Sequence, residues 1–81
     1  MLHELKLNER FCDAVYEGRK TFEVRNNDRA FQTGDLVKFI PVWDNGHEKS
    51  HPVKNKTYEI TYILSGWHIE QDYVVFAIKE K

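Results

Sequence analysis

The segment from residue 18 to residue 29, GRKTFEVRNNDR, gathers the side chains best suited to polar chemistry. Lys20 offers a compact ammonium and Arg25 a planar guanidinium, so the two supply different kinds of hydrogen-bond donor. Glu23 lies between them in sequence and can accept from a ligand's amine or hold the two cations in place. Such a set suits the edge of a base or a phosphate group. We therefore predict that Lys20, Glu23 and Arg25 bind RNA or a nucleotide-like molecule.

The same residues also fit a strand face that simply meets water. An exposed pair such as Glu23 and Arg25 usually contributes little to stability. In a regular strand, moreover, Lys20 faces the same side as Phe22, and Glu23 faces the other. The three polar groups share one cleft only if Lys20 lies at the mouth of the strand or a bulge reverses the alternation.

Residues outside this segment's centre extend the predicted site. Arg29 belongs to the loop after the strand, from which it can reach a phosphate at the rim of a cleft, and Asn27 lies in the same loop. Trp67 falls in a later connection, where its ring can stack on an unpaired base, and His68 follows it. Packing is the alternative role for the Trp67 ring.

Two other groups of residues have structural interpretations. His47 and His51 have a spacing that could bind zinc on a helix, but Gly46 and Pro52 mark this stretch as a loop. Phe11, Cys12, Ala14 and Val15 cluster on one apolar face of a predicted helix, and Cys12 is interpreted as a buried thiol. We expect no metal and no other cofactor.

Composition limits the class of protein. A length of 81 residues fits one domain, residues 1–81, and 41% hydrophobic with 31% charged residues is typical of a globular chain. A net charge of −1 argues against strong non-specific binding to long nucleic acids. The sequence has no apolar run of membrane-spanning length, its first residues do not show the basic-then-apolar pattern of a secretory signal, and it has a single cysteine. We expect a cytoplasmic protein without membrane contact.

The elements that must position the polar segment can be predicted from periodicity. Alternation predicts a first strand at residues 3–7, and a helix follows over residues 8–18, with Asn8 as its cap and Gly18 just past its end. The polar segment itself predicts a strand at residues 20–26. Further strands are predicted at residues 36–43, 57–64 and 72–80, separated by turn-rich connections.

This count predicts an α+β protein: a small β-barrel of five to six strands, with one main helix between strands 1 and 2. The strand at residues 57–64 alternates without interruption. Its apolar side chains Tyr58, Ile60, Tyr62 and Leu64 are therefore expected on one face.

GRKTFEVR resembles the G-x-K-x-x-E-x-R signature of ASCH domains (activating-signal-cointegrator homology), which are relatives of the PUA RNA-binding fold. The match falls on Gly18, Lys20, Glu23 and Arg25. The stretches HELKL, RNNDRAFQTGD and YVVFAIKE are similar to a small bacterial and phage branch of that group. The resemblance implies a PUA-like barrel whose helix lies beside a cleft, with the three charged residues lining that cleft.

The resemblance also raises the question of catalysis, because some ASCH-like proteins are amidohydrolases acting on an acylated cytidine. Their lysine corresponds to Lys20, but the position of their threonine is Glu23 here, and Thr21 lies at a different step of the strand. Their glutamate belongs to a helical insertion that this chain lacks, leaving Glu70 and Asp72 as stand-ins. We expect binding rather than catalysis, with Lys20, Thr21 and Glu23 as the catalytic candidates of the alternative.

Two further alternatives stay open. Other ASCH-like proteins are linked to RNA cleavage, for which His3 or His68 could serve as acid or base. The chain could instead be an interaction module of phage type, binding a protein partner through the strand at residues 57–64 or the long loop before it.

Overall fold

The structure is a computed structural model that describes all 81 residues. Its five strands form one sheet in the order β1-β3-β4-β5-β2. β1 pairs with β3 in parallel, whereas the remaining neighbours are antiparallel. The elements are β1 (Leu2–Asn8), helix α1 (Glu9–Tyr16), β2 (Phe22–Asn26), β3 (Leu36–Val42), a 3₁₀ helix η1 (Pro52–Asn55), β4 (Tyr58–Leu64) and β5 (Tyr73–Glu80).

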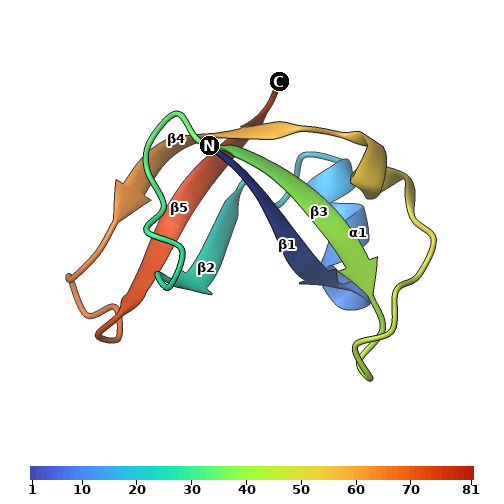
Figure 1. The fold of residues 1–81 in the computed structure, drawn as a ribbon, viewed down its shortest axis with the longest axis horizontal. Coiled ribbons are helices and arrows are strands. Elements are labelled where there is room, and N and C mark those ends of the chain that lie inside the picture. Colours follow the sequence, from blue (N-terminus) through green and yellow to red (C-terminus); the bar gives the residue numbers. More distant parts are fainter.

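The sheet curls into a half-barrel, with β1 and β3 on one side and β5 and β2 on the other (Figure 1). The two edge strands, β1 and β2, are not paired with each other. The predicted α+β class, with five strands and one main helix between the first two, is confirmed. The structure contains no helix with the length and apolar character that crossing a bilayer requires.

The first connection follows from local sequence signals. The Asn8 side chain accepts a hydrogen bond from the backbone N–H of Arg10 at 3.0 Å and so caps α1. The helix is shorter than predicted and ends at Tyr16. Gly18 then adopts a φ of +80°, a left-handed conformation that glycine enters without steric cost. This turn sends the chain directly into β2.

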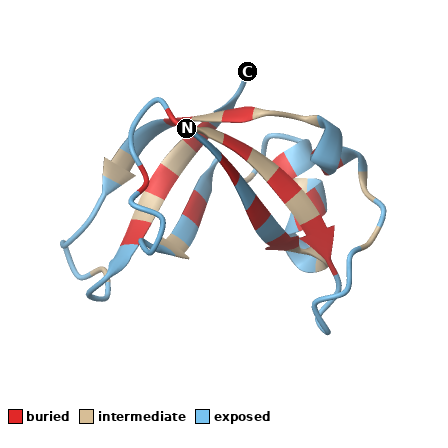
Figure 2. Cartoon of the chain, viewed as in Figure 1, coloured by how far each residue is buried: buried red, intermediate tan, exposed pale blue.

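The core lies on the inner face of the curled sheet. Buried residues alternate with exposed ones along β1 and with half-buried ones along β5, as the bands in Figure 2 show. Phe31 comes from the loop between β2 and β3 and closes one side of the core. Its ring packs 4.8 Å from the His3 ring and 4.9 Å from the Phe76 ring, measured between centroids. On the helix side the core takes Cys12 and Val15.

The prediction of one continuous apolar face on β4 is wrong in its second half. The pairing with β5 shifts register between Ile60 and Tyr62, which is a β-bulge. Tyr58 and Ile60 point inward as expected, but Tyr62 is 65% exposed and Leu64 is 36% exposed. The bulge reverses the alternation, so the last apolar residues of β4 point out of the barrel.

Candidate functional site

β2 turns its charged face inward and its apolar face outward. Glu23 is only 2% exposed, while Phe22 is 45% and Val24 is 55% exposed. Lys20 precedes the first residue of β2, so it lies at the mouth of the strand, the first of the two arrangements that could bring it to Glu23. The half-barrel thus holds a carboxylate at its interior edge.

A buried carboxylate needs compensating partners, and Glu23 has two cations. One of its oxygens, Oε2, pairs with the Lys20 ammonium. The other, Oε1, accepts from Arg25 Nε at 3.0 Å and from Arg25 Nη2 at 2.8 Å. The partners remain mostly covered, with 18% of the Lys20 side chain and 23% of the Arg25 side chain exposed. Glu23 therefore holds the cations in place, and both of its oxygens are occupied.

Arg25 and Lys20 also bind backbone carbonyls of the two edge strands. Arg25 Nη2 donates to the carbonyl of Lys6 in β1 at 2.8 Å. Lys20 Nζ donates to the carbonyl of Phe22 in β2 at 2.7 Å. These groups would otherwise be unpaired edge carbonyls. The charged network thus joins β1 and β2 where no backbone ladder does.

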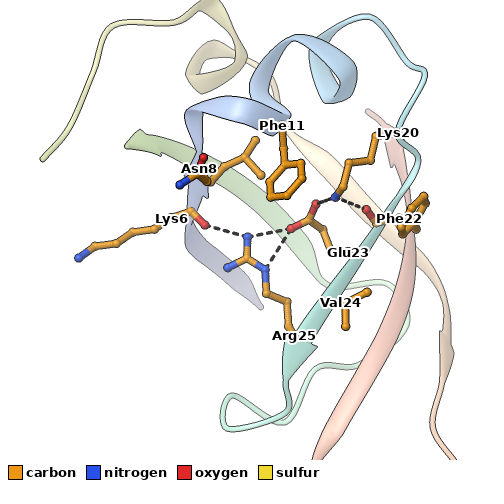
Figure 3. Close-up of a pocket in the computed structure, with 9 residues that line it drawn as sticks. Lys6, Asn8, Phe11, Lys20, Phe22, Glu23, Val24 and Arg25 are labelled. Atoms are coloured by element: carbon orange, nitrogen blue, oxygen red, sulfur yellow. Dashed lines mark hydrogen bonds and ion pairs between the residues drawn. The ribbon is translucent and has the colours of Figure 1, made fainter. Parts of the chain in front are cut away.

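A cleft of about 520 Å³ opens beside this network. Figure 3 shows Glu23 between Lys20 and Arg25, with the Phe11 ring of α1 beside it. The Lys20 ammonium lies 5.2 Å from the centroid of the Phe11 ring and 5.0 Å from that of Phe22, within the range of cation–π contacts. The lining residues are Lys6, Leu7, Asn8, Phe11, Lys20, Phe22, Glu23, Val24 and Arg25.

The cleft presents hydrogen-bond donors rather than acceptors. An ammonium has three N–H groups, and Lys20 uses two of them within the protein. A guanidinium has five, and Arg25 uses its Nε–H and both N–H groups of Nη2, so the two on Nη1 stay free. Because Glu23 is fully paired, this site favours a ligand that offers acceptor atoms, such as a phosphate or the carbonyl edge of a base.

The other predicted binding residues lie in three places outside the cleft. Arg29 is exposed and lines a smaller neighbouring cavity of about 240 Å³, to which Arg25 also contributes. Asn27 accepts from the backbone N–H of Phe31 at 3.0 Å and so shapes the loop. Trp67, which is 83% exposed, and His68 belong to the turn between β4 and β5. The structure does not bring these last two residues to the cleft.

Most of the residues that the catalytic alternative requires do not lie in the cleft. Thr21 is exposed and lines a different cavity, next to the end of α1. None of the residues that line the cleft carries a hydroxyl, thiol or imidazole group. Glu70 and Asp72 lie in the turn before β5, and neither lines the cleft. The acyl-transfer scheme uses a threonine hydroxyl as its nucleophile, and none of these nine side chains carries a hydroxyl group.

Phe11 is a lining residue whose position on the helix the sequence pattern predicts wrongly. Its spacing with Cys12 and Val15 placed it on the buried helix face, yet it is 41% exposed and its ring covers the cleft. Lys6 and Asn8 were also missed as lining residues. Asn8 gives a usable signal, because it ends β1 and caps α1, so it must lie where strand and helix meet.

Two histidine–aspartate pairs lie elsewhere in the molecule. His3, 3% exposed, donates through Nε2 to Asp35 at 2.8 Å, and this hydrogen bond is the main cause of a lowered pKa for Asp35. His51 donates through Nε2 to Asp13 at 2.8 Å and accepts from the backbone N–H of Val53 through Nδ1. Both His51 nitrogens are therefore engaged within the protein.

Cys12 is buried, as predicted. Cys12 is 0% exposed, and burial raises the pKa of its thiol. The thiol lies 3.7 Å from the carbonyl of Leu7. A protonated, covered thiol of this kind packs rather than reacts.

Comparison with known proteins places the chain in a family. Over 74 residues the chain is 34% identical to a protein of Escherichia phage P2 described as an uncharacterized 12.9 kDa protein in the GpA 3′ region. The match covers 91% of this chain and 64% of the phage protein, so the chain spans less than two thirds of that relative's length. A family model matches residues 2–78. The chain therefore belongs to the family described as Domain of unknown function (DUF3850).

Proposed function

We propose that this domain is a binding module for RNA or a nucleotide-like ligand, which it takes into the cleft at Lys20, Glu23 and Arg25. The single observation that carries the proposal is the Glu23 carboxylate, buried in the barrel edge and paired on both oxygens. A buried ion network contributes little net stability compared with an apolar core of the same shape. Its use here is to hold two cations rigidly at the wall of a cleft.

The free donors indicate the chemistry of the ligand. The remaining N–H groups of Lys20 and Arg25 need acceptor oxygens or ring nitrogens. Arg25 can bind two such atoms at once through its planar group, whereas Lys20 acts as a point charge. Phosphate oxygens and the carbonyl of a pyrimidine satisfy both requirements.

The apolar part of the cleft supports a planar ligand. Phe11 and Phe22 expose ring surface at the cleft, and aromatic rings stack on any base. The similarity of GRKTFEVR to the ASCH signature points in the same direction, since that resemblance implies a PUA-like cleft for RNA or a nucleotide. An acceptor group on the cations and a base against the rings together describe a nucleotide.

The experiment is an equilibrium titration at low salt with four probes: a short single-stranded RNA, cytidine monophosphate, cytidine and N4-acetylcytidine. We expect binding of at least one phosphate-bearing probe. The Lys20→Ala/Arg25→Ala variant should weaken that binding tenfold or more, because each charge-assisted contact is worth about 1.5–3 kcal/mol.

The matched control is Arg19→Ala/Lys81→Ala, which removes the same charge from exposed residues outside the cleft. It should weaken binding only through the general field of the protein. Equal loss in the two double variants would show that the cleft is not the site. Absence of binding by all four probes to the wild-type protein would overturn the proposed function.

A further inference from the structure

The convex side of the sheet carries an apolar surface that extends well beyond the cleft and shares only Phe22 and Val24 with its lining. The strand registers align two rows of side chains across β4, β5 and β2, all pointing out of the barrel. One row is Tyr62, Ala77 and Phe22, and the other is Leu64, Val75 and Val24. We call these six residues the outer apolar face.

The outer apolar face is a large contiguous patch for a chain of 81 residues. Its four end residues, Phe22, Val24, Tyr62 and Leu64, are between 36% and 65% exposed. Tyr73, which is 37% exposed, adjoins it on β5. With large side chains presenting about 150–250 Å² each when uncovered, the patch exposes on the order of 500 Å². The largest apolar patch of a typical monomer covers about 300–600 Å² and is often functional.

The bulge in β4 indicates that the fold specifically places these apolar side chains on the outside of the sheet. Without the register shift after Ile60, Tyr62 and Leu64 would continue inward with Tyr58. The bulge instead places both side chains in line with β5 and β2 on the outside. No residue of the two rows is charged, so the surface offers nothing to select a highly charged partner such as nucleic acid.

We propose that the outer apolar face binds a second copy of this chain. A standard interface buries about 800 Å² per partner, of which roughly 60% is apolar. That apolar share, about 480 Å², matches the area the face exposes. Two sheets can pack face to face with their apolar side chains interdigitated, and a two-fold axis lets one surface bind itself.

The charges at the two ends of β5 fit this arrangement. Lys79 points outward beyond one end of the rows and has no ion-pair partner within the chain, although the neighbouring Lys81 pairs with Glu59. Glu70 and Asp72 lie in the turn at the other end and are exposed without side-chain partners. If the two β5 strands run antiparallel across the axis, Lys79 of each copy faces the acidic turn of the other. Such complementary ends fix the register of the pair.

The test is sedimentation velocity of the full chain over a concentration series from low to several hundred micromolar. We expect the wild-type protein to shift from monomer to dimer within that range. Leu64→Glu should weaken association at least tenfold, because it places a charge within the apolar surface that the two copies bury. The matched control is Leu2→Glu, at an exposed leucine on β1 outside the two rows, and this variant should dimerise like the wild type.

A charge swap tests the orientation separately. Lys79→Glu should weaken the dimer, and Lys79→Glu combined with Asp72→Lys should restore it, because the two positions meet across the axis. A wild-type protein that stays monomeric at every concentration would overturn the proposal, as would equal behaviour of Leu64→Glu and Leu2→Glu. Neither Leu64 nor Lys79 lines the cleft, so these substitutions leave the residues proposed to bind the nucleotide unchanged.

Discussion

The Arg25 guanidinium donates to the backbone carbonyl of Lys6 at 2.8 Å, across the gap between the two edge strands of the sheet. A side chain, rather than a ladder of backbone hydrogen bonds, therefore joins β1 to β2. The same guanidinium donates two hydrogen bonds to the Glu23 carboxylate. One residue thus supports both the shape of the half-barrel and the wall of the cleft.

Replacing Arg25 with lysine should loosen this junction. Arg25→Lys keeps the charge but cannot reach Glu23 and Lys6 with one planar group. We expect a loss of about 1–2 kcal/mol in unfolding free energy, measured by urea denaturation. Arg10→Lys, at an arginine whose side chain is 61% exposed, is the control and should change stability by less than about 0.5 kcal/mol. Equal losses in the two variants would contradict the bridging role.

Glu23→Gln tests the buried network itself. The change keeps the shape of the side chain but leaves Lys20 and Arg25 without their counter-charge in a covered position. We expect a destabilisation of about 2–4 kcal/mol. Glu59→Gln removes a carboxylate whose exposed pair with Lys81 should contribute less than about 1 kcal/mol. A Glu23→Gln protein as stable as Glu59→Gln would show that the network does not hold the edge.

We expect the free energy of unfolding to fall at acidic pH, partly because Asp35 becomes protonated. The hydrogen bond from His3, followed by one from the backbone N–H of Gln32, holds the pKa of Asp35 below its usual 3.8. Its contribution is fully present above that value and is lost as the pH falls through the lower folded-state pKa. Urea midpoints measured from pH 7 down to pH 2 should therefore decline below about pH 4.

The control for this pH dependence is Asp35→Asn. It should lower stability at pH 7 and make the acid decline shallower, although Asp13 and Asp44, whose pKa values are also lowered, keep their part of it. A decline as steep as in the wild-type protein would mean that Asp35 does not contribute.

Tyr58→Phe should be neutral or stabilising by up to about 1 kcal/mol. The Tyr58 hydroxyl is buried and has no hydrogen-bond partner, and burial also raises the pKa of its phenol. Removing an unsatisfied polar group relieves its desolvation cost. Tyr62→Phe, on an exposed ring, supplies the comparison in thermal unfolding. A clear loss of stability in Tyr58→Phe alone would indicate that the hydroxyl has a partner in solution.

The protein should not deacylate N4-acetylcytidine. No lining residue of the cleft carries a hydroxyl or thiol nucleophile, and Thr21 lines another cavity. Chromatography after long incubation should show no more cytidine than a Lys20→Ala sample does. Turnover that depends on Lys20 would contradict this expectation and would favour the hydrolase alternative.

Local rules are sufficient to predict much of the fold. Asn8 and Gly18 bound the helix because capping and left-handed geometry depend on single residues. The bulge after Ile60 could not be predicted in the same way. The alternation of β4 fits an unbroken strand, and the shift depends on how the strand pairs with β5.

The charged residues of the cleft could be named from their spacing, but the direction of their strand could not. β2 alternates charged and apolar residues, and the general rule buries the apolar side. Here Lys20 and Arg25 neutralise Glu23, so the charged side turns inward and Phe22 and Val24 face outward. That inversion depends on β1 lying close enough for Arg25 to reach it, which is a tertiary relationship.

The most direct test of the account is a nitrogen-detected NMR titration that follows the side chains of Lys20 and Arg25 while a short single-stranded RNA is added at low salt. We predict that the Arg25 Nη1 and Lys20 Nζ signals shift together, with a common saturation point, while those of Arg19 and Lys81 stay in place. Saturable shifts confined to residues outside the cleft, or no shifts at any RNA concentration, would contradict the claim that these two cations receive the ligand.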